Sequence, residues 1–165
     1  MTDYSPSCIE FQAGPVNGVE LVDLTFHTDE RGWLLELFRQ DELPPNCSPV
    51  MGYVSETKAG VTRGPHMHRT QTDHFVVMGP GEFEFCLWDD REHESTFGNR
   101  LVVRIGGNQP QRLTVPPLVI HAYRNMGTSA ARLMNFPDVL YAGTHRAQPV
   151  DEIRFTDVAD HPFHW

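Results

Sequence analysis

The amino-acid sequence predicts an all-β protein, a small antiparallel barrel or sandwich. Short segments rich in apolar and β-branched residues recur along the 165 residues, and turn signals separate them. The 13 glycines and 13 prolines supply many of those signals. Residues 82–85 alternate polar and apolar side chains, which is the two-residue period of a strand with one side in water. Many short strands joined by tight turns are typical of these two architectures.

The expected strands follow one another with short gaps. Each combines apolar or branched residues with a flanking glycine, proline, asparagine or aspartate. We predict strands at residues 19–26, 51–57, 75–78, 83–88, 101–105, 113–115, 119–123 and 131–136. Residues 33–43 alone are expected to hold a helical turn or two, which Pro44 and Pro45 end.

Composition and charge exclude several classes of protein. The 22 acidic residues outnumber the 13 basic ones, for a net charge of −9 at pH 7, so we expect no binding of nucleic acid or of an anionic membrane. Three irregularly spaced cysteines predict neither a disulfide framework nor a zinc knuckle. No secretory signal or membrane-spanning run is seen. We therefore expect a soluble, cytoplasmic protein with one domain over residues 1–165 and a core at about 19–157.

Two histidine-containing segments predict a pocket. Residues 60–68 read Gly-Val-Thr-Arg-Gly-Pro-His-Met-His, and residues 116–125 read Pro-Pro-Leu-Val-Ile-His-Ala-Tyr-Arg-Asn. In a strand, residues two apart face the same side, so His66 and His68 would point together. Convergent titratable groups are typical of functional sites. We therefore expect four histidines in one cavity, namely His66, His68, His74 and His121.

The two segments resemble the two cupin motifs, and other segments narrow the resemblance to one cupin family. Residues 29–36 read Asp-Glu-Arg-Gly-Trp-Leu-Leu-Glu, residues 60–66 contain the Arg-Gly-Pro-His run, and residues 115–121 read Val-Pro-Pro-Leu-Val-Ile-His. In this order they resemble the dTDP-4-dehydrorhamnose 3,5-epimerase family. The resemblance implies a cupin-type antiparallel β-barrel or jelly roll, a nucleotide-sugar substrate, a homodimer and no cofactor.

The resemblance also implies roles for individual residues. His66 would be the base that removes a proton next to the substrate's carbonyl, and the usual pKa of histidine, near 6.5, suits that task. His121 would line the pocket. The residues implied to hold the nucleotide's phosphates and neighbouring groups are Arg31, Glu36 and Arg63. An arginine suits a diphosphate because its planar fork donates two parallel hydrogen bonds.

Several positions depart from the family pattern. His74 stands where the family has its pocket lysine, and Met134 stands where it has a proton-donating tyrosine. A thioether cannot donate a proton. Tyr141, seven residues later, would replace that tyrosine only if the strand register slipped. The family's base-orienting aspartate lies beyond the point where this chain stops, and Tyr53 lies in the segment that replaces its nucleotide-reading residues.

Three functions follow. The first is a metal-independent epimerase or isomerase of a 4-keto-6-deoxy nucleotide sugar, in which His66, His68 and His74 are the catalytic residues. The second is a metal-binding cupin enzyme that uses His66, His68, His121 and either Asp73 or His74, a ligand set suited to Fe, Mn, Ni or Zn. The third is a non-catalytic cupin that binds a sugar nucleotide.

Overall fold

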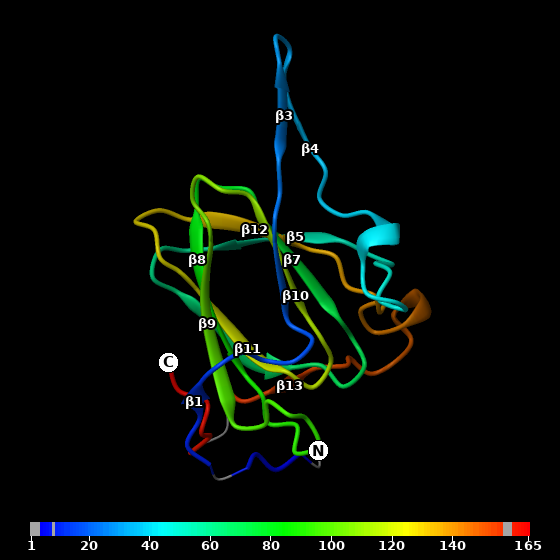
Figure 1. The fold of residues 1–165 in the computed structure, drawn as a ribbon. Helices are drawn as coiled ribbons and strands as arrows, with labels where there is room; N and C mark the ends of the chain where they lie inside the picture. Colours follow the sequence, from blue (N-terminus) through cyan, green and yellow to red (C-terminus); the bar gives the residue numbers. More distant parts are fainter. Residues whose placement is uncertain (1–3, 8, 157–159) are drawn as a thin grey trace.

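The computed structural model describes residues 4–7, 9–156 and 160–165, and it is built from two facing β-sheets and a projecting hairpin (Figure 1). Residue 157, the predicted end of the core, lies outside the described residues. The six-stranded sheet has the order β1 (Gln12–Ala13), β9 (Asn99–Gly106), β8 (Glu82–Trp88), β11 (Ile120–Asn125), β6 (Thr62–Met67) and β13 (Ile153–Arg154). The five-stranded sheet has the order β2 (Glu20–Asp23), β10 (Gln111–Val115), β7 (Asp73–Val77), β12 (Ala131–Asn135) and β5 (Tyr53–Thr57).

The all-β prediction is confirmed. Apart from the parallel pair β1–β9, the strand pairs of the described residues are antiparallel, and these residues form no α-helix. Two short 3-10 turns, Gln40–Glu42 and Thr144–Arg146, lie in loops. No helix among the described residues is long and apolar enough to cross a membrane.

Two apolar clusters decide which side chains face the cavity. The larger cluster fills the space between the two sheets and includes Phe75, Phe85 and Leu113. The smaller cluster covers the outer side of the six-stranded sheet, where Met67 packs under segments from both ends of the chain. Because strand residues alternate sides, the outward Met67 leaves its neighbours in sequence, His66 and His68, on the inner side.

The region of residues 19–43 differs from its prediction. The expected strand at 19–26 is divided into β2 and the start of β3 (Phe26–Asp29), and the expected helical segment begins as a strand, β4 (Gly32–Leu35). The apolar run that favoured a helical turn pairs instead with β3, since Gly32 adopts a φ of 132° at the hairpin turn. Only Gln40–Glu42 has a helical turn.

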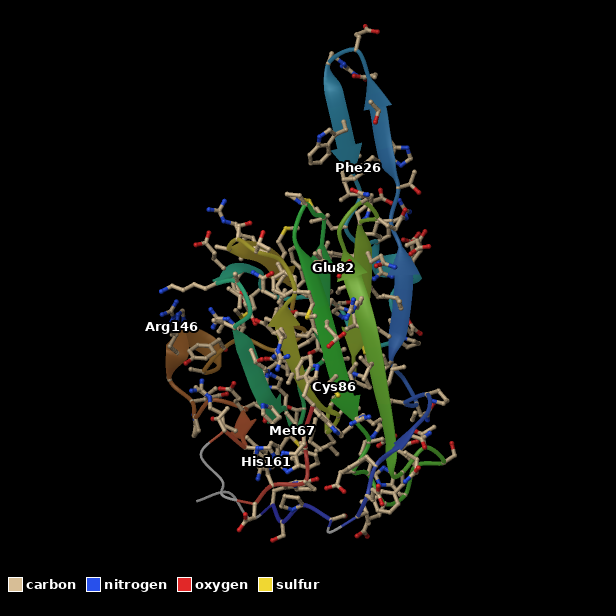
Figure 2. All side chains as sticks on the ribbon, turned by 90° about the vertical axis from the view of Figure 1, so that its left-hand side faces the viewer. Phe26, Met67, Glu82, Cys86, Arg146 and His161 are labelled. Carbon is tan, nitrogen blue, oxygen red and sulfur yellow. The ribbon has the colours of Figure 1, made fainter. Side chains whose placement is uncertain are left out.

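The β3–β4 hairpin stands away from the two sheets (Figure 1). Phe26 and Trp33 pack edge to face across it, with ring centroids 4.8 Å apart. Trp33 is 59 % exposed and Leu34 is 63 % exposed. Figure 2 shows the hairpin, labelled at Phe26, extending past the ends of the neighbouring strands. The single chain therefore leaves apolar side chains of the hairpin in water.

Candidate active site

A cavity of about 670 Å³ opens between the sheets and is lined by two of the predicted histidines, His66 and His68. His121, also expected in the cavity, is 1 % exposed and packs against the His66 ring. His66 comes from β6, His68 follows the end of that strand, and His121 comes from β11. His121 is the register partner of His66 in the β6–β11 pair. Gly64 permits this close approach, because a Cβ there would lie 2.6 Å from the carbonyl oxygen of His121.

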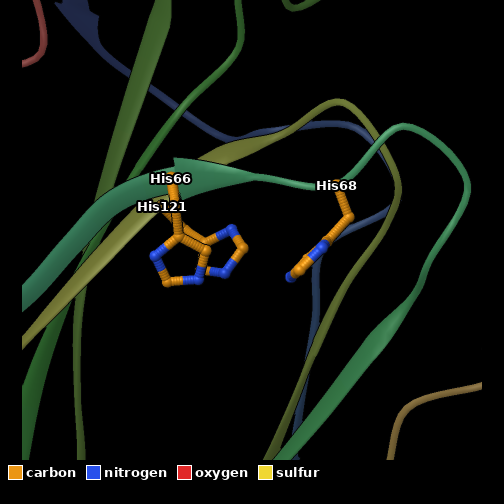
Figure 3. A group of neighbouring side chains, drawn as sticks. All are labelled: His66, His68 and His121. Atoms are coloured by element: carbon orange, nitrogen blue, oxygen red, sulfur yellow. The ribbon is translucent and has the colours of Figure 1, made fainter. Parts of the chain in front are cut away.

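The three histidines form a compact cluster (Figure 3). The ring centroids of His66 and His121 are 4.3 Å apart, those of His66 and His68 are 5.6 Å apart, and those of His68 and His121 are 6.1 Å apart. One ring nitrogen from each lies within 4.8 Å of the others. Such a set can exchange protons with a ligand or hold a cation.

A buried carboxylate, Asp73, lies beside this cluster. Its Oδ2 is 3.4 Å from Nε2 of both His68 and His121. Its Oδ1 accepts hydrogen bonds from Gln71 Nε2 at 2.8 Å and from Asn135 Nδ2 at 2.7 Å. Burial opposes ionisation of Asp73, but the hydrogen bonds and the neighbouring histidines outweigh it and hold the pKa well below its usual value. Asp73 therefore carries a buried negative charge beside the histidines.

Backbone carbonyls determine which ring nitrogens carry hydrogen. Nδ1 of His68 contacts the carbonyl oxygen of Asp151, and Nδ1 of His121 lies 3.0 Å from the carbonyl oxygen of Val119. A carbonyl oxygen only accepts, so both Nδ1 atoms must donate. In a neutral ring Nε2 then has a lone pair, and both Nε2 atoms face the Asp73 carboxylate. This arrangement requires a shared proton or a bound cation between these groups.

His66 has a different environment from its two neighbours. Burial lowers the pKa of His66 well below 6.5, and the nearby His121 and His68 lower it further. His66 is consequently neutral at pH 7, with a ring nitrogen available to accept a proton. A neutral imidazole in a cavity has the protonation state that a general base needs.

Of the remaining predicted residues, Arg63 lines the cavity. Its Nε donates to Thr57 Oγ1 and its NH2 group to the carbonyl oxygen of Glu56, both at 2.9 Å. A guanidinium has five N–H groups, so these two bonds orient the side chain and leave other donors for a ligand.

The prediction that His74 shares this cavity is wrong. Asp73 and Phe75 face inward from β7, so His74 between them faces the outer side of the five-stranded sheet. There its Nδ1 lies 3.1 Å from Thr114 Oγ1 and its Nε2 lies 2.9 Å from the carbonyl oxygen of Cys47. His74 therefore holds the segment that covers the sheet and has no contact with the histidine cluster.

Arg31 and Glu36 also lie outside the cavity of their own chain. Arg31 is at the turn of the β3–β4 hairpin, where its side chain is 84 % exposed and its NH2 group is 2.5 Å from Asp29 Oδ2. Glu36 lines a separate small hollow with Arg39 and Arg112. Neither side chain can contact a ligand in this chain's cavity without a large movement.

Other residues that line the cavity were not predicted to act there. Tyr141 and Arg146 come from the loop after β12, and Figure 2 shows Arg146 on this loop at the edge of the molecule. Arg154 comes from β13, and Tyr53 comes from β5. Met134, which stands at the position of the family's acid, pairs with Val76 and faces the outer side of the sheet. The next residue, Asn135, faces inward and binds Asp73. Residues two apart in a strand face the same side, so the spacing of Tyr53, Ser55 and Thr57 could have predicted that Tyr53 faces inward.

Two facing sheets with a histidine cluster in the space between them define a cupin-type β-barrel. A sequence model of the dTDP-4-dehydrorhamnose 3,5-epimerase family matches residues 13–155, and the chain belongs to this family. The predicted family membership is therefore confirmed.

Individual relatives agree with this assignment. The probable low-salt glycan biosynthesis epimerase Agl13 of Haloferax volcanii is 35 % identical over 127 residues, which cover 76 % of this chain and 81 % of that protein. The spore coat polysaccharide biosynthesis protein SpsL of Bacillus subtilis is 32 % identical over 128 residues, which cover 76 % and 82 %. A dTDP sugar isomerase from Desulfovibrio desulfuricans superposes with a TM-score of 0.77 at 26 % identity, over 91 % of this chain and 92 % of that one.

We expect the His66 imidazole to remain neutral as the pH falls through 6.5, because burial lowers its pKa. An NMR titration of labelled histidine should therefore give a midpoint well below 6.5. The charge of Asp73 raises the pKa of His66, so Asp73→Asn should lower the midpoint further, whereas Asp41→Asn, at an exposed position, should leave it unchanged. A midpoint at or above 6.5 would show that His66 is not the neutral base inferred here.

Proposed function

We propose that the protein is an epimerase or isomerase of a 4-keto-6-deoxy nucleotide sugar and that His66 removes the proton next to the carbonyl. The observation that carries this proposal is the neutral, half-buried His66 in the wall of a cavity of about 670 Å³. Family membership and the names of the relatives, an epimerase and a polysaccharide biosynthesis protein, support a role in carbohydrate biosynthesis. The predicted cytoplasmic location is part of this proposal.

The groups around His66 suit the chemistry of proton abstraction. Loss of a proton next to a carbonyl places negative charge on the carbonyl oxygen, and catalysis requires a group that stabilises this enolate. Arg63 lines the same cavity and has N–H groups beyond the two that bind Thr57 and Glu56, so it can donate to this oxygen. His66 can then accept the carbon-bound proton.

The arginines of the cavity suit the nucleotide part of the substrate. Arg63, Arg146 and Arg154 all line it, although the chain as a whole has a charge of −9. Guanidinium groups recognise phosphate oxygens through paired hydrogen bonds. Asp151 and Glu152 line the cavity as well, and Glu152 pairs with Arg154, so Arg63 and Arg146 are the cations that would bind an anionic small molecule.

We also propose that the chain acts as a homodimer in which the hairpin of one copy completes the cavity of the other. The resemblance gives Arg31 a phosphate-binding role, but the turn that carries it stands away from its own barrel (Figure 1). The exposed Trp33 and Leu34 lie on the same hairpin and would be buried against a partner. A second copy would explain both observations.

A metal-binding enzyme is the second candidate function, and the tautomers of His68 and His121 favour it. Both Nε2 atoms present lone pairs to the Asp73 carboxylate, and carbonyl oxygens orient both rings from behind, as is common for metal ligands. Together with His66, the donor set of three imidazoles and one carboxylate fits Fe, Mn, Ni or Zn. Such a cation would polarise the substrate's carbonyl oxygen. His66 would then be a ligand and could not be the base.

The proposed reaction predicts solvent exchange. In deuterated water, 4-keto-6-deoxy nucleotide sugars should gain deuterium next to the carbonyl, detected by NMR or mass spectrometry. His66→Asn should slow this exchange at least ~100-fold, the usual contribution of a general base. His93→Asn is the matched control, because His93 is 74 % exposed and distant from the cavity. Binding of the sugar nucleotide without any exchange by the wild type would favour a non-catalytic cupin.

Metal content separates the two enzyme candidates. If the second candidate is correct, untagged protein should contain about one equivalent of a divalent metal per chain by elemental analysis, and His121→Ala should lose it while His93→Ala retains it. Metal-free protein that still exchanges deuterium in the presence of a chelator would exclude a metal enzyme. That result is the one we expect from the leading proposal.

The dimer predicts complementation between two inactive variants. Arg31→Ala lacks the hairpin contact and His66→Asn lacks the base, so each homodimer should be nearly inactive. In co-expressed mixtures about half the dimers contain one chain of each kind, and one of their two cavities has both residues, which restores roughly a quarter of wild-type activity. A mixture no more active than its parents would contradict the contribution of Arg31 to a partner's cavity.

A further inference from the structure

Epimerisation needs a proton donor opposite the base, and the residue at the family's acid position cannot serve. Met134 faces the outer side of the five-stranded sheet, and its thioether has no proton to give. His68 directly follows the strand that carries His66. A proton returned by His68 would therefore arrive from the same side as the base and would not invert the carbon.

Three tyrosines line the cavity, and their surroundings distinguish them. Tyr123 is only 5 % exposed and is packed against phenylalanine rings, with centroids 5.1–5.8 Å away, so it belongs to the core. Tyr141 lies on the loop after β12 and is 55 % exposed. Tyr53 lies on β5, within the five-stranded sheet, and is 43 % exposed toward the open space. Of the three, Tyr53 therefore combines a backbone fixed in a sheet with a side chain that a ligand can reach.

The hydrogen bonds of Asn135 leave the Tyr53 hydroxyl free to donate. Asn135 Nδ2 is 2.7 Å from Asp73 Oδ1 and 3.0 Å from Tyr53 Oη. The Asp73 carboxylate only accepts, so the amide nitrogen, not the amide oxygen, must face it. That nitrogen only donates, and Tyr53 Oη is therefore an acceptor in this bond. The hydrogen of the Tyr53 hydroxyl is not used by Asn135.

Tyr53 and His66 lie where they could invert the configuration of a substrate carbon. His66 reaches the cavity from the six-stranded sheet, and Tyr53 reaches it from the facing five-stranded sheet. A sugar ring bound between the sheets would thus present one face to each residue. Burial raises the pKa of Tyr53 to about 12, so its hydroxyl retains a proton at neutral pH.

We propose that Tyr53 is the proton donor of this enzyme and that Asn135 positions it. The inference rests on the proposed function. His66 takes the proton from the carbon next to the carbonyl, and the electron pair of that C–H bond moves to the carbonyl oxygen as an enolate. The Tyr53 O–H bond then breaks as its proton adds to the opposite face of the same carbon, and the enolate oxygen regains its double bond to carbon. After this step Tyr53 is a phenolate and His66 is an imidazolium, and proton transfer through solvent restores both residues.

Tyr53→Phe tests the proposal because it removes only the hydroxyl. In deuterated water this variant should still exchange the proton removed by His66, but formation of the inverted sugar, followed by NMR, should fall at least ~100-fold. Tyr4→Phe is the matched control and should form the inverted sugar at the wild-type rate, because Tyr4 packs against Phe155 in the outer cluster and does not line the cavity. If Tyr53→Phe inverts the sugar as well as the wild type does, the assignment of Tyr53 is wrong although the proposed function stands. If the wild type exchanges no deuterium with any of these sugars, both are wrong.

A second measurement covers the case in which Tyr53→Phe does not fold. Incorporation of 3-fluorotyrosine at position 53 retains the hydroxyl but makes the phenol more acidic. If Tyr53 must be protonated to act, the alkaline limb of the plot of kcat against pH should move to lower pH. The same replacement at position 4, outside the cavity, should leave that limb in place. An alkaline limb that position 53 does not move would overturn the proposal.

Discussion

The hydrogen bonds and histidine contacts of one buried carboxylate, Asp73, organise the site. A charged carboxylate away from water is tolerated only where hydrogen bonds and opposite charges satisfy it. Here the side chains that do so come from both sheets: Asn135 from β12 and His121 from β11, with His68 and Gln71 from the β6–β7 connection. The same carboxylate thus sets the distance between the sheets, orients two histidine rings and holds the amide that contacts Tyr53.

A second aspartate, Asp151 in the wall of the cavity, supports the first. The carboxylate of Asp151 accepts hydrogen bonds from the backbone N–H groups of Arg69, Thr70 and Gln71, and its carbonyl oxygen contacts Nδ1 of His68. The connection between β6 and β7 is therefore fixed in shape, and with it the tautomer of His68. Asp151 lies near the end of the chain, so residues distant in sequence orient the histidine that faces Asp73.

How much of the site could be predicted from the sequence depended on whether the evidence was local. The His-Met-His alternation predicted that His66 and His68 face one side, and the strands themselves were visible as apolar runs between turns. Correspondence with the family's pocket lysine placed His74 in the cavity, but such a correspondence does not determine which side of a strand a residue faces. Phe75 in the core shows that the sides are reversed.

The structure of the hairpin differs from its prediction, and the sequence left open which side of its strand Met134 faces. Residues 33–35 are apolar, and propensity alone cannot distinguish a buried helical turn from a hairpin whose apolar side chains are exposed in the single chain. Family spacing placed Met134 at the acid's position, but pairing with Val76 turns it outward and brings Asn135 inward. Both outcomes depend on contacts with distant segments, which the local pattern does not contain.

The two-sheet architecture relates the fold to the stereochemistry of the proposed reaction. A ligand held between facing sheets has one face toward β6 and β11 and the other toward β5, β7 and β12. Proton carriers on one sheet act on one face of the sugar, so His66 and His68 together can move a proton only along that face. Carriers on opposite sheets can remove a proton from one face and return it to the other. In the proposed reaction, the choice between isomerisation and epimerisation therefore depends on which sheet supplies the acid.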